Sequence, residues 1–454
     1  MSYLGNTPTT QSFISGTDYF NGDGSTTAFT LSRTVVSVND IEAVVNNVVQ
    51  QPNTAYNISG TTITFTSAPS SGTSNVYVRY LSTTTQSITP SQNTVSYSTM
   101  NTDMQGTFGG SFKNRIINGA MMIDQRNAGA SYSAVDSTYC LDRWKLASYD
   151  GSAQTGKFTV QQNAGSVTPP AGFINYLGIT SSAATTGSST AIYYFAQLIE
   201  GLNVTDLGWG TASASSVTVS FWVRSSLTGT FGGAITNSAQ NYSYPFTFVI
   251  NSANTWEQKT ITIVGPTAGT WLTTNGVGAR LIFNLGTGST YTGTSGSWSA
   301  NTYLNATGST NFLGTNGATF YITGVQLEKG STATSFDYRP YGTELALCQR
   351  YYQKLAGFTC AGDSTTSVGM SIPFTLPMRS SPSVGQTGVI TIEDMGSADR
   401  TQSSTSISIR SSRINTVGGC FSMANFTGLT AFRPFIQCVN FNGTDNYITL
   451  SAEL

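Results

Sequence analysis

Short runs in which every second residue is apolar, separated by turns rich in Gly, Ser and Asn, constrain the fold of this chain more than any other feature. Side chains alternate between the two faces of a strand, so these runs predict half-buried strands. Residues 217–223, 281–285 and 76–80 alternate in this way, and 56–65 predicts a hairpin that turns at Ser59-Gly60. The pattern predicts an all-β protein. It shows no fixed period of the kind that a propeller or a β-helix requires.

One segment, residues 344–355, predicts a helix instead. Its apolar and aromatic residues, such as Leu347, Tyr351 and Leu355, recur at helical spacing and form one stripe. Thr343 is placed to cap the first turn. The helix follows a turn-like Arg-Pro-Tyr-Gly segment, so we expect it to mark a domain boundary.

The alternating pattern stops at residues 82–112, where Ser, Thr, Gln and Asn dominate, and this change indicates a linker. We therefore expect four parts in an elongated fibre protomer. They are an N-terminal β domain at 1–84, a neck at 85–112, a central jelly-roll sandwich at 113–342, and a short helix with a distal C-terminal β-sandwich at 343–454.

Charge is scarce. Asp, Glu, Lys and Arg make up 9% of the residues, against about 25% in an average domain. With a net charge of −1 the chain lacks the cationic surface that nucleic-acid binding requires. It contains neither a basic amphipathic stretch nor a long apolar run, so we expect no membrane insertion, and we see no secretory signal. A neutral surface rich in hydroxyl and amide groups favours hydrogen bonding to neutral partners such as glycans.

The same composition argues against catalysis and metal binding. Histidine is absent, which removes the commonest general base and metal ligand. No pair of acids has a diagnostic spacing, and Asp142 is expected to pair with Arg143 or with an arginine at a sheet edge. The 21–24 loop with Asp18 and Asp23 favours a turn over a calcium site. We predict no catalytic residues, metal or cofactor, and we expect the five widely spaced cysteines to be buried free thiols.

Exposed aromatic residues are the candidate carbohydrate ligands, because sugar rings stack on them. Trp222 lies opposite the apolar face of its strand and should point outward, and Trp298 lies in a Gly/Ser loop. For Trp222, packing against a neighbouring chain or domain is the favoured alternative. The other four tryptophans are expected in core or edge positions. They are Trp144, Trp209, Trp256 and Trp271.

Polar loops at 394–405 and 440–446 are candidate receptor-binding tips. Their candidate residues are Asp399, Arg400, Asn442 and Asp445. The charges of residues 393–413 form a mixed cluster in the sequence, which a solvated turn also explains.

Three segments resemble tail-fibre proteins of tailed bacteriophages, notably phages of cyanobacteria and other aquatic bacteria. The first segment is 17–31 (TDYFNGDGSTTAFTL), followed by 38–41 and 59–69. The second segment is 114–127 (NRIINGAMMIDQRN) with 141–144 (LDRW). The third segment runs from 324–330 (GVQLEKG) through 336–342 (FDYRPYG) to 351–352. The last two bracket a region similar to carbohydrate-binding jelly rolls of phage tail proteins, and the ending 447–454 also looks like the terminus of such a fibre.

The resemblance implies a homotrimer that binds a virion tail protein (adaptor, nozzle or baseplate) through its N-terminal domain. It also implies non-catalytic attachment to a host surface polysaccharide through the distal domains. Such a protein belongs to the virion tail; it is made in the host cytoplasm and becomes extracellular after lysis. Two alternatives remain: a polysaccharide-degrading tailspike, and a capsid-decorating or adaptor protein.

Overall fold

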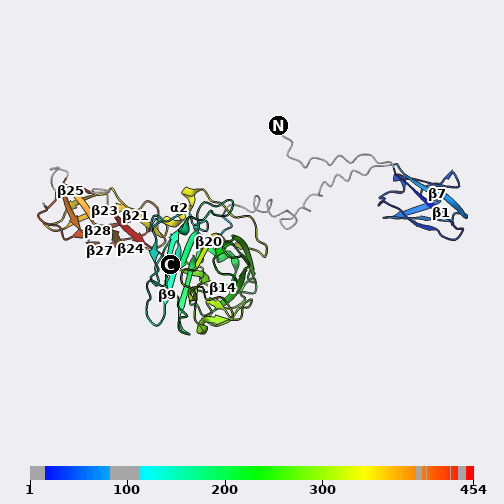
Figure 1. Ribbon diagram of the computed structural model, residues 1–454. Coiled ribbons are helices and arrows are strands. Elements are labelled where there is room, and N and C mark those ends of the chain that lie inside the picture. Colours follow the sequence, from blue (N-terminus) through cyan, green and yellow to red (C-terminus); the bar gives the residue numbers. More distant parts are fainter. Residues whose placement is uncertain (1–15, 82–111, 395–400, 405, 430, 438–445) are drawn as a thin grey trace. The chain divides into compact units, whose positions relative to one another are not determined.

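The structure, a computed structural model, forms two compact units, Met1–Val95 and Ser96–Leu454 (Figure 1). The described residues are 16–81, 112–394, 401–404, 406–429, 431–437 and 446–454. They confirm the all-β class: α2 (Tyr341–Gln349) is the single α-helix among them. No helix in the described ranges is long and apolar enough to cross a bilayer.

The N-terminal unit contains two small antiparallel sheets. One has the order β1 (Thr17–Gly22), β7 (Gly72–Tyr80), β3 (Ile41–Val45), β4 (Val48–Val49); the other has β2 (Ala28–Thr30), β6 (Thr62–Phe65), β5 (Tyr56–Ser59). The predicted hairpin is confirmed: Ile58 pairs with Ile63, and Gly60 takes a φ of 61° in the turn. The predicted shared face is confirmed too, since Val76 and Val78 are fully buried in the core.

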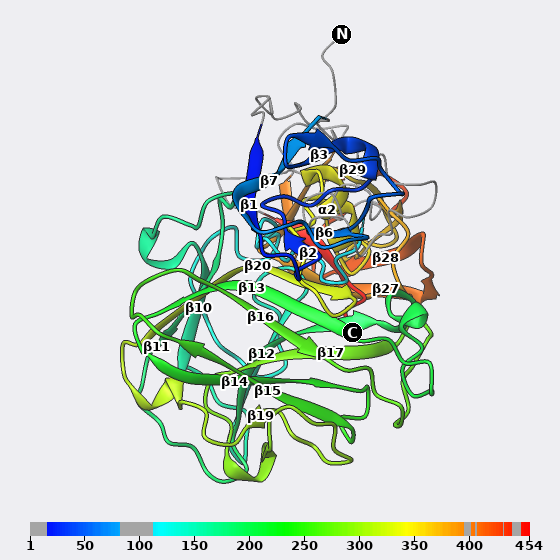
Figure 2. The same ribbon diagram turned by 90° about the vertical axis from the view of Figure 1, so that its right-hand side faces the viewer.

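The central region is a sandwich of two antiparallel sheets (Figure 2). The six-stranded sheet has the order β16 (Glu257–Ile263), β13 (Val217–Ser225), β20 (Thr319–Lys329), β11 (Leu177–Ser181), β10 (Phe158–Gln162), β8 (Tyr132–Ser133). The five-stranded sheet has the order β15 (Ser243–Ile250), β14 (Gly229–Thr236), β17 (Val277–Asn284), β12 (Ile192–Glu200), β9 (Trp144–Tyr149). A short parallel pair, β18 (Thr292–Gly293) with β19 (Asn305–Ala306), lies in the loop before β20.

Apolar side chains at every second position of the strands point between the two sheets and form the core of this sandwich. Phe221 from one sheet packs edge-on against Phe283 from the other, with ring centroids 5.0 Å apart. The predicted faces in 217–223 and 281–285 are confirmed, because their alternate apolar residues are buried in this one core. The outer face of the five-stranded sheet is also covered, since Leu304 from the β18–β19 loop packs on Ala196 and Ile282.

The C-terminal region has its own core between two further sheets. The three-stranded sheet is β21 (Tyr352–Leu355), β30 (Tyr447–Ser451), β24 (Ser383–Thr387). The seven-stranded sheet is β26 (Thr401–Ser404), β25 (Ile390–Asp394), β29 (Pro434–Gln437), β22 (Thr359–Gly362), β23 (Val368–Pro373), β28 (Gly418–Ala424), β27 (Ser406–Ile414). Short 3-10 helices occur elsewhere in the chain: η1 (Val38–Asp40), η3 (Ala164–Ser166), η4 (Gly201–Asn203), η5 (Thr205–Leu207), η6 (Ser289–Tyr291) and η7 (Phe312–Gly314).

The predicted helix at 344–355 is displaced and shortened. It starts at Tyr341 after Pro340, so Thr343 lies inside the first turn and caps nothing. It ends at Gln349 because the following residues pair with β30, with Leu355 opposite Ile448. Strand pairing in the C-terminal sheet therefore overrides the helical spacing of the sequence.

A buried junction joins the C-terminal region to the sandwich. Cys348 and Tyr351 pack on Ile117 and Ile123. Arg143, 1% exposed, pairs with Glu453, which lies near the C-terminus marked in Figure 1. The helical stripe is thus covered by residues of the same chain.

Charged groups hold this junction together, and many of them belong to the segments that resemble tail fibres. Arg126 also pairs with Glu453, at 2.8 Å, and its guanidinium lies 3.7 Å from the Tyr352 ring centroid. Glu200 accepts from Arg350 at 2.8 Å and from the Tyr351 hydroxyl at 2.6 Å. Residues of the second and third motifs and of the 447–454 ending therefore form structural contacts between the two cores.

The expected pairing of Asp142 is wrong. Its carboxylate accepts the backbone and side-chain N–H groups of Gln125, both at 2.7 Å. Asp142 and Arg143 lie in the turn before β9, where Arg143 takes a φ of 71°, and the Arg143 side chain reaches Glu453 instead.

Candidate functional site

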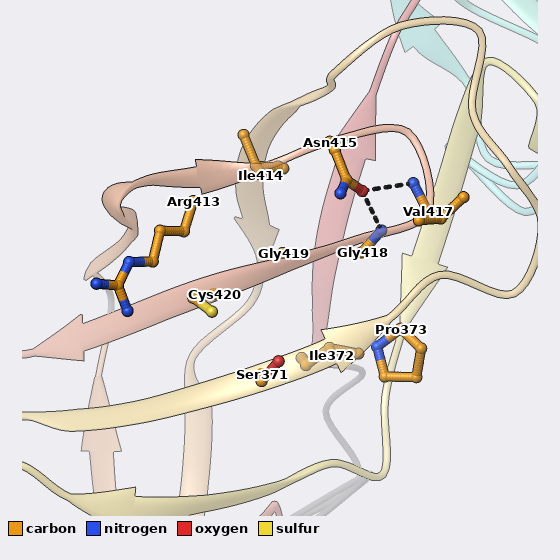
Figure 3. Close-up of a pocket in the computed structure, with 10 residues that line it drawn as sticks. All are labelled: Ser371, Ile372, Pro373, Arg413, Ile414, Asn415, Val417, Gly418, Gly419 and Cys420. Atoms are coloured by element: carbon orange, nitrogen blue, oxygen red, sulfur yellow. Dashed lines mark hydrogen bonds between the residues drawn. The ribbon is translucent and has the colours of Figure 1, made fainter.

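An open groove of about 540 Å³ crosses the outer face of the seven-stranded sheet (Figure 3). It lies over β28, with β23 on one side and β27 on the other. The lining residues are Ser371, Ile372, Pro373, Arg413, Ile414, Asn415, Val417, Gly418, Gly419 and Cys420.

Strand alternation explains which groups face the groove. Phe421 and Met423 are buried in the C-terminal core, so Cys420 and the other alternate residues of β28 face outward. Ser371 lies opposite Cys420 in the register of β23 and β28. The floor consists of small residues, so a ligand could approach the backbone closely.

A tight turn between β27 and β28 closes one end of the groove. The side-chain oxygen of Asn415 accepts the backbone N–H groups of Val417 and Gly418, at 2.9 and 3.0 Å. Both hydrogen bonds are visible in Figure 3. They fix the turn, so this end of the groove is preformed.

Among the described residues that line the groove, Arg413 is the one charged residue, and it is exposed. Its side chain extends from β27 toward β28, and the Cys420 thiol lies between it and Ser371 (Figure 3). No carboxylate occurs among the described residues that line the groove. A guanidinium, a hydroxyl and exposed backbone can bind a polar ligand, but they provide no acid–base pair.

The mixed charge cluster expected at 393–413 is not one group in the described residues. Arg410 pairs with Asp363 at 2.8 Å, and Asp394 pairs with Arg433 at 3.2 Å. These ion pairs depend on which strands lie side by side in the sheet, so the partners Asp363 and Arg433 come from outside residues 393–413.

A second hollow, of about 290 Å³, lies at a loop end of the sandwich. Its described lining consists of Gly, Ser, Thr and Asn residues, including Gly187, Gly286 and Asn311. Two buried atoms nearby have no hydrogen-bond partner within the described residues, the Tyr193 hydroxyl and Asn311 Oδ1. A hollow of this kind can hold water or a neutral polar group.

Trp222 points outward, as predicted, and is half-buried. It lies on the outer face of the six-stranded sheet between Gln258 and Thr323, its register partners on β16 and β20. Sugar contact at Trp222, like the alternative of packing against another chain, stays a prediction.

Trp298 is not an isolated exposed side chain. It is half-buried and its ring lies 5.4 Å from Trp271 and 6.0 Å from Trp209. Its indole N–H donates to the backbone carbonyl of Val264 at 2.6 Å. The ring stacks on Tyr242 at 5.7 Å, so loops that are distant in sequence fix it in an aromatic cluster.

The four remaining tryptophans occupy core or edge positions, as predicted: Trp144 and Trp209 are buried, and Trp256 and Trp271 are partly buried. The candidate tip residues Asp399, Arg400, Asn442 and Asp445 lie outside the described residues.

The two acids of the candidate calcium site, Asp18 and Asp23, accept local hydrogen bonds. Asp23 accepts from Ser25 and Thr26 in a turn, which holds the pKa of Asp23 well below its usual range. Asp18 accepts from the Tyr80 hydroxyl. No group of three metal-binding side chains occurs within the described ranges.

The cysteines in the described part are free thiols. Cys140, Cys348 and Cys360 are buried, Cys420 is half-buried, and Cys438 lies outside the described residues. Burial raises the pKa of Cys140 and Cys360 to about 12, so both stay protonated at neutral pH.

Solved structures that match this chain include sugar-binding proteins and a phage protein. The enzymatically active domain of tailspike protein 4 of bacteriophage CBA120 matches 48% of this chain at 14% identity and a TM-score of 0.27. The match spans about a fifth (21%) of that protein's length. The family 11 carbohydrate-binding module of Clostridium thermocellum, in complex with a mixed-linked tetrasaccharide, matches 45% of this chain and 97% of its own, at 12% identity and a TM-score of 0.22.

A putative sugar-binding protein of Bacteroides thetaiotaomicron matches 48% of this chain and 99% of its own, at 14% identity and a TM-score of 0.27. No family model and no curated protein matches the chain. At these TM-scores the similarity carries no argument about activity or ligand.

Sequence reasoning did not single out the groove. In the sequence Arg413 is one charge of the 393–413 cluster, and no local pattern brings Ser371 and Cys420 together. The available signal was the Gly418-Gly419-Cys420 run, which indicates a strand with a small-residue face.

Proposed function

We propose that this protein is a non-catalytic tail fibre of a bacteriophage, which attaches the virion to a glycan on the host cell surface. The groove across β23, β28 and β27 is the observation that carries the proposal. Its lining offers hydroxyl, amide, guanidinium and backbone groups. These groups match the hydroxyl-rich surface of a polysaccharide.

The described lining residues include no carboxylate, and this favours binding over hydrolysis. Glycoside hydrolysis commonly uses two carboxyl groups that flank the scissile bond. The polysaccharide-degrading tailspike therefore stays the alternative. Release of reducing ends from a host polysaccharide by the full chain would favour it.

The separate N-terminal unit and its resemblance to a fibre anchor support attachment to a tail protein through this unit. We place the protein in the virion tail for the same reason. A homotrimer would raise the effective affinity of weak single sites. The helical stripe is buried within one chain, so trimerisation is proposed on the resemblance alone. Light scattering tests it: the mass of one chain, 48.0 kDa, would contradict it.

Binding of purified full-length protein to host cells tests the main proposal. Ser371→Trp would fill the groove from an exposed position, and Val249→Trp, at an exposed position of the edge strand β15, is the matched control. We expect the first variant to lose at least tenfold in cell binding and the control to bind normally. Equal binding by both variants would place recognition elsewhere, and no binding by the unmodified protein to any candidate host would contradict attachment.

A further inference from the structure

We propose that the groove selects an acidic polysaccharide, with the Arg413 guanidinium binding a carboxylate of the glycan. This inference rests on the proposed function and names the class of glycan.

Arg413 alone among the arginines of the described part has no hydrogen-bond, ion-pair or aromatic partner. On the same sheet, Arg410 is paired with Asp363 and Arg433 with Asp394. Elsewhere arginines bind carboxylates, backbone carbonyls or aromatic rings; examples are Arg280 on the Ser238 carbonyl and Arg224 on the Asn254 carbonyl. In a chain with so few charges, an unpaired cation inside a groove is a candidate ligand contact.

The geometry of the groove suits a carboxylated sugar. The Arg413 guanidinium can offer two parallel N–H donors to a carboxylate, a pairing that combines charge with geometric specificity. Ser371 lies on the far side of Cys420 from Arg413 and can bind a ring hydroxyl (Figure 3). None of the described lining residues carries a carboxylate that would repel an anionic ligand.

The contact is exposed to solvent, so its strength should depend on salt. Opposite charges near a surface are screened over about 8–10 Å at physiological ionic strength. Several copies of a weak ionic contact along a repeating anionic polymer would still give useful avidity.

The test compares polygalacturonate with its fully methyl-esterified form, which has the same backbone without the charge. Full-length protein should bind polygalacturonate at least tenfold more tightly than the ester, and 0.5 M NaCl should remove most of this difference. Arg413→Gln should lose at least tenfold in binding to polygalacturonate, while Arg413→Lys should retain part of it.

Arg410→Gln is the matched control, because it removes the same charge from the same strand outside the groove lining. It should change binding less than twofold. Equal binding of both polymers, no binding of either, or equal losses in the two Gln variants would overturn the inference. If Arg413→Gln binds host cells as well as the unmodified protein does, the acidic ligand is overturned and the proposed attachment function stays intact. If the unmodified protein does not bind host cells at all, the attachment function itself is contradicted. Unchanged thermal melting shows that the variants fold.

Discussion

Glu453 is the residue that ties the C-terminal region to the sandwich. Its side chain is 7% exposed and pairs with Arg143, itself 1% exposed, and with Arg126. Arg143 also donates to the Leu198 carbonyl at 2.5 Å and lies over the Tyr351 ring at 3.6 Å. Because both ions are withdrawn from water, the loss of one partner leaves the other charge buried.

Glu453→Gln should therefore lower the free energy of unfolding by about 3–5 kcal/mol. Asp206→Asn breaks a pair with Arg115 in which Asp206 is 48% exposed, and it should cost less than about 1 kcal/mol. Urea denaturation measures both values. Similar small losses in the two variants would show that the buried pair is not important for stability.

Asp142 should make stability depend on pH. Burial raises its pKa to about 6, although Gln125 donates two hydrogen bonds to it. The folded state thus binds this proton more tightly than the unfolded chain, where the carboxyl has a pKa near 3.8. The stabilising contribution is complete below about pH 4 and is lost as the pH rises through 6.

Asp142→Asn should remove this pH-dependent contribution. Relative to the variant, the unmodified protein should gain roughly 3 kcal/mol between pH 7 and pH 4. The measurement is the unfolding free energy of both proteins at several pH values. The contributions of the other titrating groups cancel in the difference between the two proteins. Parallel pH profiles for the two proteins would refute the raised pKa.

At the scale of elements, α2 depends on tertiary contacts and not on a side-chain cap. Pro340 occupies the N-cap position, and no side chain there accepts a hydrogen bond from the helix. Glu344 in the first turn accepts from the Asn118 backbone N–H and from Arg339 at 3.2 Å. The helix is therefore held by the sandwich that it covers.

Substitutions in this first turn should show whether a side-chain cap or contacts with the sandwich stabilise α2. Thr343→Ala should change the unfolding free energy by less than about 0.5 kcal/mol, because this residue caps nothing. Glu344→Gln should cost about 2–3 kcal/mol, since it removes charge from a buried hydrogen-bonded network. Chemical denaturation measures both. A larger effect of Thr343→Ala would restore the capping role.

At the scale of the molecule, the two compact units should unfold independently of each other. Removal of residues 1–95 should leave the thermal transition of Ser96–Leu454 within about 2 °C of its position in the full chain, because each unit has its own core. Differential scanning calorimetry measures this. A shift of more than 5 °C would contradict independent folding.

The two cores inside Ser96–Leu454 should not be separable in the same way. A 113–342 fragment would expose Ile117 and Ile123 and leave Arg143 without Glu453. We expect it to melt well below the 96–454 fragment or to aggregate, as seen by calorimetry and light scattering. Equal melting temperatures would show that the junction contributes little.

Alternation in the sequence was enough to predict the all-β class, the hairpin at 56–65, and the faces of β7, β13 and β17. It succeeded because strand faces are a local consequence of backbone geometry. It failed at 350–355, where helical spacing competed with strand pairing. Tyr352 and Leu355 pair with residues almost 100 positions away, and no local pattern reports that.

The outward direction of Trp222 was likewise determined by the sequence, because it follows from its strand alone. Tertiary structure decided the partners: Glu453 for Arg143, the tryptophan cluster for Trp298, and the groove in which Arg413 lies. Each of these brings together residues from separate strands or loops. Ion pairs and grooves depend on distances in space, whereas a sequence pattern records only distances along the chain.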